Sequence, residues 1–264
     1  MRLVFTSACL ALLAALSSGA VSPAITAEQI ARAVQDRDTG RDSTAGLRMK
    51  LFDRRGRVRD RAMTVLTLRR TAGDRTLIRF SYPNDIRGTA FLVWEHPRED
   101  DERFLFLPSL GRVRRIAGSE AQESFVGSDF SYEDIGGREF DDYTYALLDE
   151  NASWAAPGGA SRPAYRLESR RKDSSVEFPR VASLILKDSF VVVQAEIFNR
   201  RNEKQKTYVV SGLQQVQGIW TVMASAMSND LDKTRTELVV ESIAYNTGLT
   251  EAAFTRRELE GAGR

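Results

Sequence analysis

Two carboxylic acids, Asp129 and Glu133, are the strongest candidates for catalysis in this sequence of 264 residues. They stand four residues apart in an apolar, turn-rich segment that also contains Phe125, Phe130 and Tyr132. A pair of acids can hydrolyse a glycosidic bond without help from histidine or cysteine. An acid that caps a short helix would give the same pattern, so an acid-pair hydrolase is only a remote alternative.

Other residue types that carry enzymatic chemistry are scarce. His96 is the only histidine, which excludes an HExxH motif and a histidine-rich metal site. Cys9 is the only cysteine and lies in an apolar N-terminal stretch, so a chain cleaved after that stretch would have no thiol nucleophile, disulfide or cysteine zinc site. The acids at 99–102 follow Pro97 and are typical of a polar hairpin turn. We therefore expect a protein that is not an enzyme, with no cofactor and no metal.

The first 20 residues have the pattern of a secretory signal peptide. Arg2 is the only charged side chain among them, and an apolar stretch at 10–16 and small residues at 17–20 follow it. A membrane anchor needs about 20 apolar residues, more than this stretch has. We predict cleavage after Ala20, or as late as residue 27, and a periplasmic mature protein. Without Arg2 its basic and acidic residues nearly balance, unlike those of a nucleic-acid-binding protein.

The remaining sequence predicts few helices and many strands. A helix over 26–37 begins with a capping box of Thr26 and Gln29, and Gly40 ends it. Ser119, Ser131 and Thr250 are candidate starts of further short helices. Alternating apolar residues between Gly, Asp, Asn and Pro signals predict strands at 47–52, 64–70, 76–82, 89–95, 103–107, 112–116, 143–148, 164–169, 182–186, 190–198, 207–213, 219–227 and 236–245.

About a dozen strands with short connections indicate one antiparallel meander, curled into a barrel or half-barrel. In the strand at 190–198, the residues Val191, Val193, Ala195 and Ile197 share an apolar face. The segment 155–161, rich in Ala, Gly and Pro, is too short for a domain linker and is predicted to be a hairpin loop. The expected fold class is α+β, mostly β.

Three motifs between Tyr82 and Asp134 carry a resemblance to a known family. They read YPNDIRGTAFL at 82–92, FLFLPSLGRVRRI at 104–116 and SFVGSDFSYED at 124–134. The sequence resembles the exported outer-membrane lipoprotein-sorting proteins (LolA/LolB-like), in the branch associated with RND-type exporters. The ending at 234–259 is also similar, so the resemblance covers nearly all of the mature chain.

The resemblance implies a single lipid-carrier domain at 21–264. Its expected fold is a half-open antiparallel β-barrel of about 11 strands, with helices that cover a concave apolar face. In true lipoprotein carriers of the family, a basic residue before a Pro-Asn pair latches the lid. Here Tyr82 has that place before Pro83-Asn84. Arg87 is a candidate to replace the basic residue, and lipid as well as lipoprotein remains open as cargo.

Two groups of residues are candidates for a ligand site. Aromatic side chains are expected to form the cavity wall or the lid: Phe91, Phe106, Phe125, Phe130, Tyr132 and Trp220. Charged side chains are expected at the lid or at a ligand's head group: Arg87, Arg114, Arg115 and Asp129. A plain hydrophobic core would explain the aromatic residues, and a solvated strand edge would explain the arginines.

The leading hypothesis for function is a periplasmic carrier that shuttles lipid or lipoprotein acyl chains between membranes. One long acyl chain is worth on the order of 10 kcal/mol at ~0.8 kcal/mol per buried CH₂, so crossing water requires an enclosed apolar trough. The alternative is an accessory subunit that binds an RND-type exporter. The expected partners are acyl chains, an inner-membrane RND-type transporter and an outer-membrane acceptor, with no nucleic acid, and the expected state is a monomer.

Overall fold

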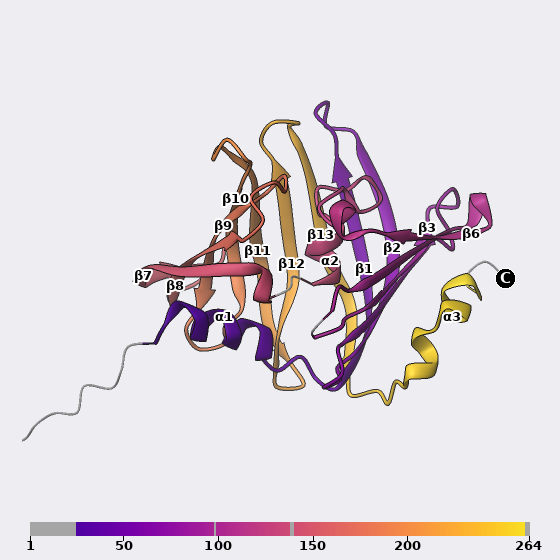
Figure 1. Cartoon of the computed structure of the whole chain (residues 1–264), viewed down its shortest axis with the longest axis horizontal. Helices are drawn as coiled ribbons and strands as arrows, with labels where there is room; N and C mark the ends of the chain where they lie inside the picture. Colours follow the sequence, from indigo (N-terminus) through magenta and orange to yellow (C-terminus); the bar gives the residue numbers. More distant parts are fainter. Residues whose placement is uncertain (1–24, 98, 138–139, 262–264) are drawn as a thin grey trace, which may run out of the picture.

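The computed structural model describes residues 25–97, 99–137 and 140–261. These residues form one antiparallel sheet of 13 strands, in the order β6-β5-β4-β3-β2-β1-β13-β12-β11-β10-β9-β8-β7. The chain therefore starts at the middle of the sheet, moves to one edge, crosses to the opposite edge and returns to the middle. The edge strands β6 and β7 do not pair with each other, so the sheet is open, and it curves around α2 (Figure 1).

The strands fall into two meanders on either side of the β1–β13 pair. The first meander contains β1 (Asp42–Phe52), β2 (Val58–Leu68), β3 (Arg75–Tyr82), β4 (Ala90–Trp94), β5 (Glu102–Leu107) and β6 (Arg112–Ile116). The second contains β7 (Tyr143–Trp154), β8 (Arg162–Arg171), β9 (Arg180–Leu186), β10 (Val192–Phe198), β11 (Lys204–Val216), β12 (Ile219–Asn229) and β13 (Thr234–Tyr245). The helices are α1 (Ala27–Asp36), α2 (Tyr132–Gly136) and α3 (Arg256–Glu260), with short 3₁₀ turns η1 (Pro108–Leu110), η2 (Gly118–Glu120), η3 (Phe125–Gly127), η4 (Phe140–Asp142) and η5 (Glu251–Phe254).

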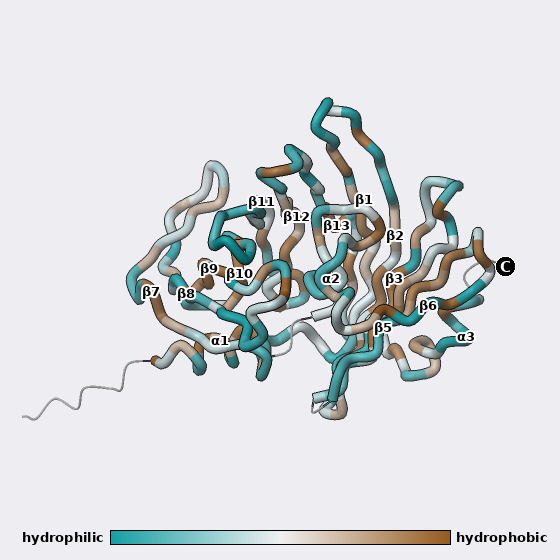
Figure 2. Tube along the Cα trace, turned by 45° about the horizontal axis from the view of Figure 1, so that its top comes forward, coloured by the Kyte–Doolittle hydropathy of each residue, from teal (hydrophilic) through white to brown (hydrophobic). Residues whose placement is uncertain are grey.

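Short polar turns let consecutive strands fold back on each other. In the β1–β2 hairpin, the Asp53 carboxylate accepts hydrogen bonds from the main-chain N–H of Arg55 and Arg57 at 2.8 and 3.0 Å. Gly56 supplies the positive φ of +75° that this turn requires. Figure 2 shows the hydrophilic hairpin loop beside the apolar stretches of the strands. The predicted hairpin loop at 155–161 is also present, between β7 and β8.

Helix α1 forms where the sequence predicts it. Thr26 caps its first turn, and the side chain of Gln29 accepts a hydrogen bond from the Thr26 N–H at 2.8 Å. Its apolar face, with Ile30 fully buried, packs against Leu167 of β8 and Ile185 of β9. Helix α1 therefore covers the second meander near the β7 edge (Figure 1).

Each predicted segment overlaps one strand, although those at 64–70, 89–95 and 190–198 extend beyond it, and the expected total of about 11 strands is wrong, because the described sheet has 13. That total came from the family resemblance, whereas the apolar alternation predicts 13 segments, one for each strand. Both edge strands are largely exposed: only one of the five side chains of β6 is buried, and only the first and last of the 12 in β7. Each pairs with a single neighbour, as edge strands do.

Opposite faces of the first meander are covered by different segments. Along β4, Phe91 and Val93 belong to a core cluster with Tyr132 at the start of α2, whereas Leu92 belongs to a cluster with Phe254 and Leu259. Because alternate strand residues point to opposite faces, α2 and α3 cover opposite sides of the sheet. The expectation that helices cover the concave face holds for α1 and α2, and α3 lies on the other face.

The segment 117–142, which we call the crossover, joins the two edges across the inner face of the sheet. It contains η2, η3, α2 and η4. Phe125 and Tyr132 pack against the first meander, and Phe130 packs against β9, β10 and β12 of the second. The candidate helix starts at Ser119 and Ser131 fall at η2 and α2, and the Ser131 hydroxyl caps α2. The crossover thus holds the two halves of the curved sheet together.

A bulge modifies the predicted face of β10. Its pairing with β9 shifts between Val192 and Gln194. As a result Ala195 and Ile197 pack with Phe130, while Val193 packs in a separate cluster with Trp154 and others, and Val192 packs beneath α1. The predicted signal peptide lies outside the described residues. Within the described part of the chain, no helix is long and apolar enough to cross a membrane.

Candidate ligand cavity

Two adjacent cavities lie between the inner face of the second meander and the segments that cover it. The first, which we call the α1 cavity, has a volume of about 410 Å³ and lies against Ala31 and Val34 of α1. The second, the α2 cavity, has a volume of about 380 Å³ and lies against Ile135 of α2. Gly137, Ser183 and Val192 line both cavities, so the two spaces meet at these residues.

The wall of the α2 cavity is mainly apolar, whereas the wall of the α1 cavity combines an apolar part with a polar one. The apolar side chains of the α1 cavity are Ala31, Val34, Phe140, Tyr145, Leu167, Ile185 and Val192, and those of the α2 cavity are Phe130, Ile135, Val192, Ala195, Ile197, Tyr208, Met227 and Leu238. Small side chains on neighbouring strands make the space: Ser183 on β9, Ala195 on β10 and Ser225 on β12. Each volume lies in the range of about 300–1,000 Å³ that is usual for small-molecule sites.

Three of the predicted aromatic residues fill the inner face of the first meander. The rings of Phe91 and Phe125 are 5.4 Å apart, those of Phe91 and Tyr132 are 5.3 Å apart, and those of Phe125 and Tyr132 are 5.6 Å apart. Phe91 and Phe125 are completely buried. These side chains form a core beside the cavities, and none of them lines either cavity.

The other three predicted aromatic residues lie in different places. Phe130 lines the α2 cavity. Phe106 packs with Phe254 and Leu259 on the face of the sheet opposite to Phe91. Trp220 lies under the guanidinium of Arg162, 4.4 Å from the ring centre, and lines neither cavity. A cavity wall or lid role for the six aromatic residues stays a prediction.

The predicted arginines form ordinary surface contacts. Arg87 donates to the Asn84 side chain at 2.9 Å, within its own loop. Arg114 pairs with Glu120, and Arg115 lies 4.0 Å from Glu102. Consecutive residues of β6 point to opposite faces, so Arg114 and Arg115 do not form one basic surface. Their role at a lid or a head group stays a prediction.

Asp129 makes hydrogen bonds to two strands of the second meander. Its carboxylate accepts hydrogen bonds from the hydroxyls of Thr234 and Thr236, the latter at 2.7 Å. Its main-chain N–H donates to Thr236 Oγ1 at 3.0 Å, and its carbonyl accepts from Lys206 Nζ at 3.0 Å. Asp129 therefore anchors the crossover to β11 and β13.

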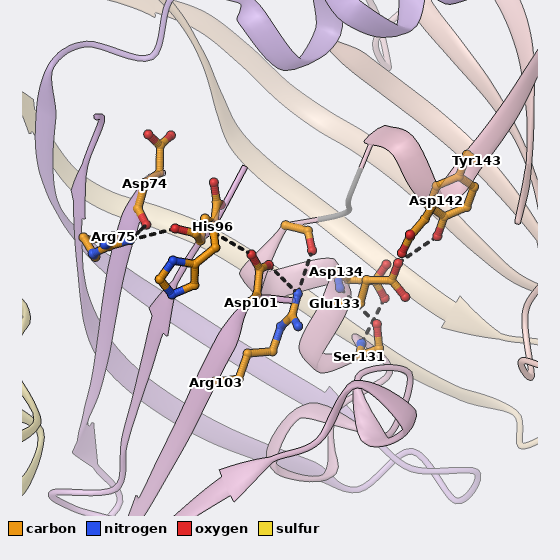
Figure 3. A network of polar contacts seen from close by, with 12 residues as sticks. Asp74, Arg75, His96, Asp101, Arg103, Ser131, Glu133, Asp134, Asp142 and Tyr143 are labelled. Carbon is orange, nitrogen blue, oxygen red and sulfur yellow. Dashed lines mark hydrogen bonds and ion pairs between the residues drawn. The ribbon is translucent and has the colours of Figure 1, made fainter. Parts of the chain in front are cut away.

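Glu133 is the second half of the proposed acid pair, and it has different partners. Its Oε1 accepts from Tyr143 at 2.7 Å (Figure 3). It also accepts from Arg171 Nη1 at 2.5 Å, and Arg171 pairs with Asp142 at 2.7 Å. Burial alone would lower the pKa of Arg171, but the charge of Glu133 raises it above its ordinary value. The two acids are thus separate anchors for the crossover.

A second polar group, whose members the sequence did not bring together, lines the α1 cavity. It contains Asp74, Glu95, His96 and Asp101, brought there by the β2–β3 turn and the β4–β5 connection. Asp101 is buried and paired with Arg103 at 2.7 Å (Figure 3). Burial raises the pKa of Glu95 to about 7, and the nearby carboxylates of Asp74 and Asp101 add to this increase, while Arg103 opposes it.

The side chain of Arg69, the residue that follows β2, fixes the C-terminal end of α1. Arg69 Nη1 donates to the carbonyl of Arg37 at 2.5 Å, and Nη2 donates to the carbonyl of Gln35 at 3.2 Å. These carbonyls have no partner within the helix, and a cation is favourable at this end of the helix dipole. No local pattern in the sequence distinguishes Arg69 from the other arginines of β2 and its turn.

The described residues contain no group of three or more His, Cys, Asp or Glu side chains placed to hold a metal ion. A family model described as an uncharacterized "-like" protein family matches residues 72–261. No curated protein matches the chain.

Solved structures give the most informative comparison. An outer membrane lipoprotein-sorting protein domain from Vibrio parahaemolyticus has a TM-score of 0.80 and 28% identity, over 89% of this chain and 98% of that chain. A DUF1329 family protein from Desulfovibrio piger has a TM-score of 0.79 and 27% identity, over 88% of this chain and 97% of that chain. A LolA superfamily protein from Nitrosomonas europaea has 18% identity and a TM-score of 0.67, over 89% of this chain and 100% of that chain, and indicates a common fold.

Proposed function

This chain belongs to the outer-membrane lipoprotein-sorting, LolA/LolB-like family, and we propose that it is a periplasmic carrier that encloses an apolar ligand in the α1 and α2 cavities. The cavities are the single observation that carries this proposal. These two spaces of about 410 and 380 Å³ meet at Gly137, Ser183 and Val192, and each has the volume of a small-molecule site.

The segments over the cavities suit a carrier that must also release its ligand. Helix α1 has only ten residues, and it contacts the sheet through the small apolar face of Ala27, Ile30 and Ala31. Arg69 holds its C-terminal end, and Arg32 stacks on Phe140 at 3.7 Å. We propose α1 as the lid of the α1 cavity and Arg69 as its latch.

The arrangement of the acids supports a carrier over an acid-pair hydrolase. A retaining or inverting glycosidase needs one acid that donates a proton and one carboxylate that attacks or activates water. Asp129 is held by two threonine hydroxyls, and Glu133 by Tyr143 and Arg171. Both carboxylates serve as anchors of the crossover, which explains their burial without catalysis.

Mass spectrometry of material that copurifies with the periplasmic protein tests this proposal. A carrier should retain about one lipid per chain after native purification, recovered by extraction with organic solvent. A consistently empty protein that instead binds tightly to a periplasmic loop of an RND-type exporter would support the accessory-subunit alternative and contradict the carrier.

A substitution at the junction of the cavities sharpens the test. Ser183→Leu adds bulk where the α1 and α2 cavities meet, so we expect at least about a tenfold loss of copurified lipid. Ser242→Leu makes the same change at an exposed position of β13 and should leave the lipid content unchanged. Circular dichroism checks that both variants are folded. Equal lipid content in both variants would place the ligand outside these cavities.

A further inference from the structure

The charges around the α1 and α2 cavities specify the head group of the ligand. Among the described residues that line these cavities, the ionisable side chains are the acids Asp74, Glu95, Asp101, Glu133 and Asp134, with His96 and two tyrosines, and none is Lys or Arg. An anionic head group inside the cavities would therefore meet like charges. This inference rests on the proposed carrier function.

Most of these acids already have partners. Asp101 is neutralised by Arg103, Glu133 by Arg171, and Asp134 caps α2 by accepting from the Ser131 N–H at 2.9 Å. Asp74 accepts one hydrogen bond, from the Arg70 N–H at 2.8 Å. None of these contacts involves Glu95.

Among the described residues, Glu95 differs from Asp101 and Glu133 because no arginine side chain pairs with it. In the part of the chain that the structure describes, no side chain donates a hydrogen bond to its carboxyl group, and the main chain of Asp74 only partly offsets the effect of burial on its pKa. The adjacent Arg75 does not compensate, because its guanidinium binds the main-chain carbonyls of Gly73, Asp74 and Glu95. A half-buried carboxylate that no cation pairs with directly is costly, so this position favours a ligand that supplies one.

The Glu95 carboxyl lies beside the junction of the two cavities. A Cβ atom on Gly137 would lie only 2.9 Å from Glu95 Oε1, and Gly137 lines both cavities. Gly137 also has a φ of +98°, which residues with a side chain rarely adopt. The glycine thus leaves open the space in which a ligand atom could approach the carboxyl.

The arginines outside the α1 cavity do not reverse this charge pattern. A surface groove of about 1050 Å³ adjoins the cavity at Asp74 and Glu95 and is lined in part by Arg32, Arg69 and Arg70. These three are engaged: Arg32 stacks on Phe140, Arg69 caps α1, and Arg70 pairs with Glu251 at 2.9 Å. The fourth arginine of the groove, Arg41, is exposed to solvent. The acids Asp36 and Asp38 line the same groove.

We propose that the cavities bind an amphiphile whose head group is a protonated amine, with the amine against Glu95 and Asp74 and the apolar part along Leu167, Ile185 and Val192. A primary ammonium has three donors, which suits two carboxylates on one side of a cavity. The apolar walls beyond the acids then bury the hydrocarbon part of the same molecule.

Calorimetric titration of the purified chain with four C12 probes tests the head-group preference. The probes are dodecylammonium, 1-dodecanol, dodecanoate and dodecyl phosphate, kept below their micelle concentrations at a pH of about 8. We expect dodecylammonium to bind at least about tenfold more tightly than dodecanoate, with dodecanol between them. Dodecanoate or dodecyl phosphate binding as tightly as dodecylammonium would overturn the inference. Binding of none of the four would instead contradict the carrier function.

A matched pair of variants assigns the preference to one carboxyl. In Glu95→Gln we expect the ratio of dodecylammonium to dodecanoate affinity to fall below about threefold, with dodecanol binding unchanged. Glu99→Gln makes the same charge change in the exposed β4–β5 connection, outside the cavity, and should retain the wild-type ratio. An unchanged ratio in Glu95→Gln would remove Glu95 from the site, and the wild-type titration still tests the head-group class if this variant fails to fold.

Discussion

The two halves of the inner face are built on the same strand pattern, but one is filled and the other is hollow. On β1–β6, which we call the filled half, the crossover inserts Phe125 and Tyr132 against Phe80 and Phe91. On β7–β13, the hollow half, small residues such as Ser183 and Ala195 face the covering segments and leave two cavities. The filled half thus contributes packing that stabilises the fold, whereas the hollow half leaves space for a ligand.

The difference has a physical origin in side-chain volume. A fully buried aromatic ring gains the transfer free energy of its apolar surface and many dispersion contacts. A wall of Ser and Ala cannot fill the same distance between a sheet and its cover, so the void loses those contacts unless a ligand supplies them. The hollow half should therefore be stabilised by its ligand, and the filled half should not depend on one.

The largest expected effect is the loss of a ring from the filled half. Phe125→Ala should lower the free energy of unfolding by about 3–5 kcal/mol, because Phe125 is completely buried against Phe80, Phe91 and Tyr132. Urea denaturation of the ligand-free protein measures the loss. Phe140→Ala, at the wall of the α1 cavity, removes a partly buried ring and should cost less than half as much. Equal losses in the two variants would contradict the division into halves.

The second largest effect concerns the anchor between the crossover and the hollow half. Asp129→Ala leaves the hydroxyls of Thr234 and Thr236 without their shared acceptor, so we expect a loss of about 2–3 kcal/mol in the free energy of unfolding. Asp230→Ala is the matched control, because Asp230 is exposed and its ion pair with Lys204, at 3.6 Å, lies on the surface. This substitution should lower the free energy of unfolding by less than about 0.5 kcal/mol. A small effect at Asp129 would mean that the ring contacts alone hold the crossover.

Much of this architecture could be predicted from the sequence, because it depends on local patterns. The capping box of Thr26 and Gln29 placed α1, and apolar alternation located every strand segment. Strand boundaries were less accurate: β1 starts at Asp42 and β2 at Val58, both earlier than expected, because main-chain pairing extends beyond the apolar residues.

The cavities could not be predicted, because no local pattern encodes them. Their walls combine small residues from β9, β10 and β12 with helices that lie in other parts of the sequence, α1 for one cavity and α2 for the other. The opposite directions of Phe91 and Phe106 likewise depend on the pairing register of β4 and β5, in which Ala90 faces Phe106. The sequence places Glu95 at the end of a predicted strand, but its environment comes from Asp74, Asp101 and Gly137, which no local pattern connects to it.

A third prediction addresses the pH dependence that Glu95 gives the hollow half. Its pKa is about 7 in the folded protein, compared with an ordinary value of 4.5. The folded state therefore binds more protons than the unfolded state between these values, so the free energy of unfolding falls as pH rises through this window. Glu95→Gln should remove this decrease and stabilise the ligand-free protein by on the order of 2 kcal/mol at pH 8.

The same comparison at low pH provides the control. At a pH of about 4, Glu95 is protonated in both states, so Glu95→Gln should change the free energy of unfolding little. Glu99→Gln, at an exposed position, should follow the wild-type curve throughout. Urea titrations across this range measure all three proteins. A constant offset between Glu95→Gln and the wild type at every pH would show that the carboxyl does not titrate in this window.

The smallest expected effect on stability, at the latch of α1, should have a clear effect on dynamics. Arg69→Ala removes the donors to the carbonyls of Gln35 and Arg37, so we expect a loss of only about 1 kcal/mol in the free energy of unfolding. Hydrogen exchange in α1 should accelerate several-fold, because local opening at this end no longer breaks those contacts. The filled half should exchange as in the wild type.

Arg41→Ala is the matched control for the latch, because Arg41 lines the same surface groove but its side chain is exposed and makes no hydrogen bond to α1. It should leave the exchange of α1 unchanged. If α1 covers the ligand, a probe such as 1-dodecanol should also dissociate faster from Arg69→Ala than from Arg41→Ala, with the ratio of dissociation rates close to the ratio of α1 exchange rates, since both processes need the same opening. Faster exchange of α1 without faster dissociation would mean that the ligand leaves by the α2 cavity, and α1 would then be a cover that stays closed during release.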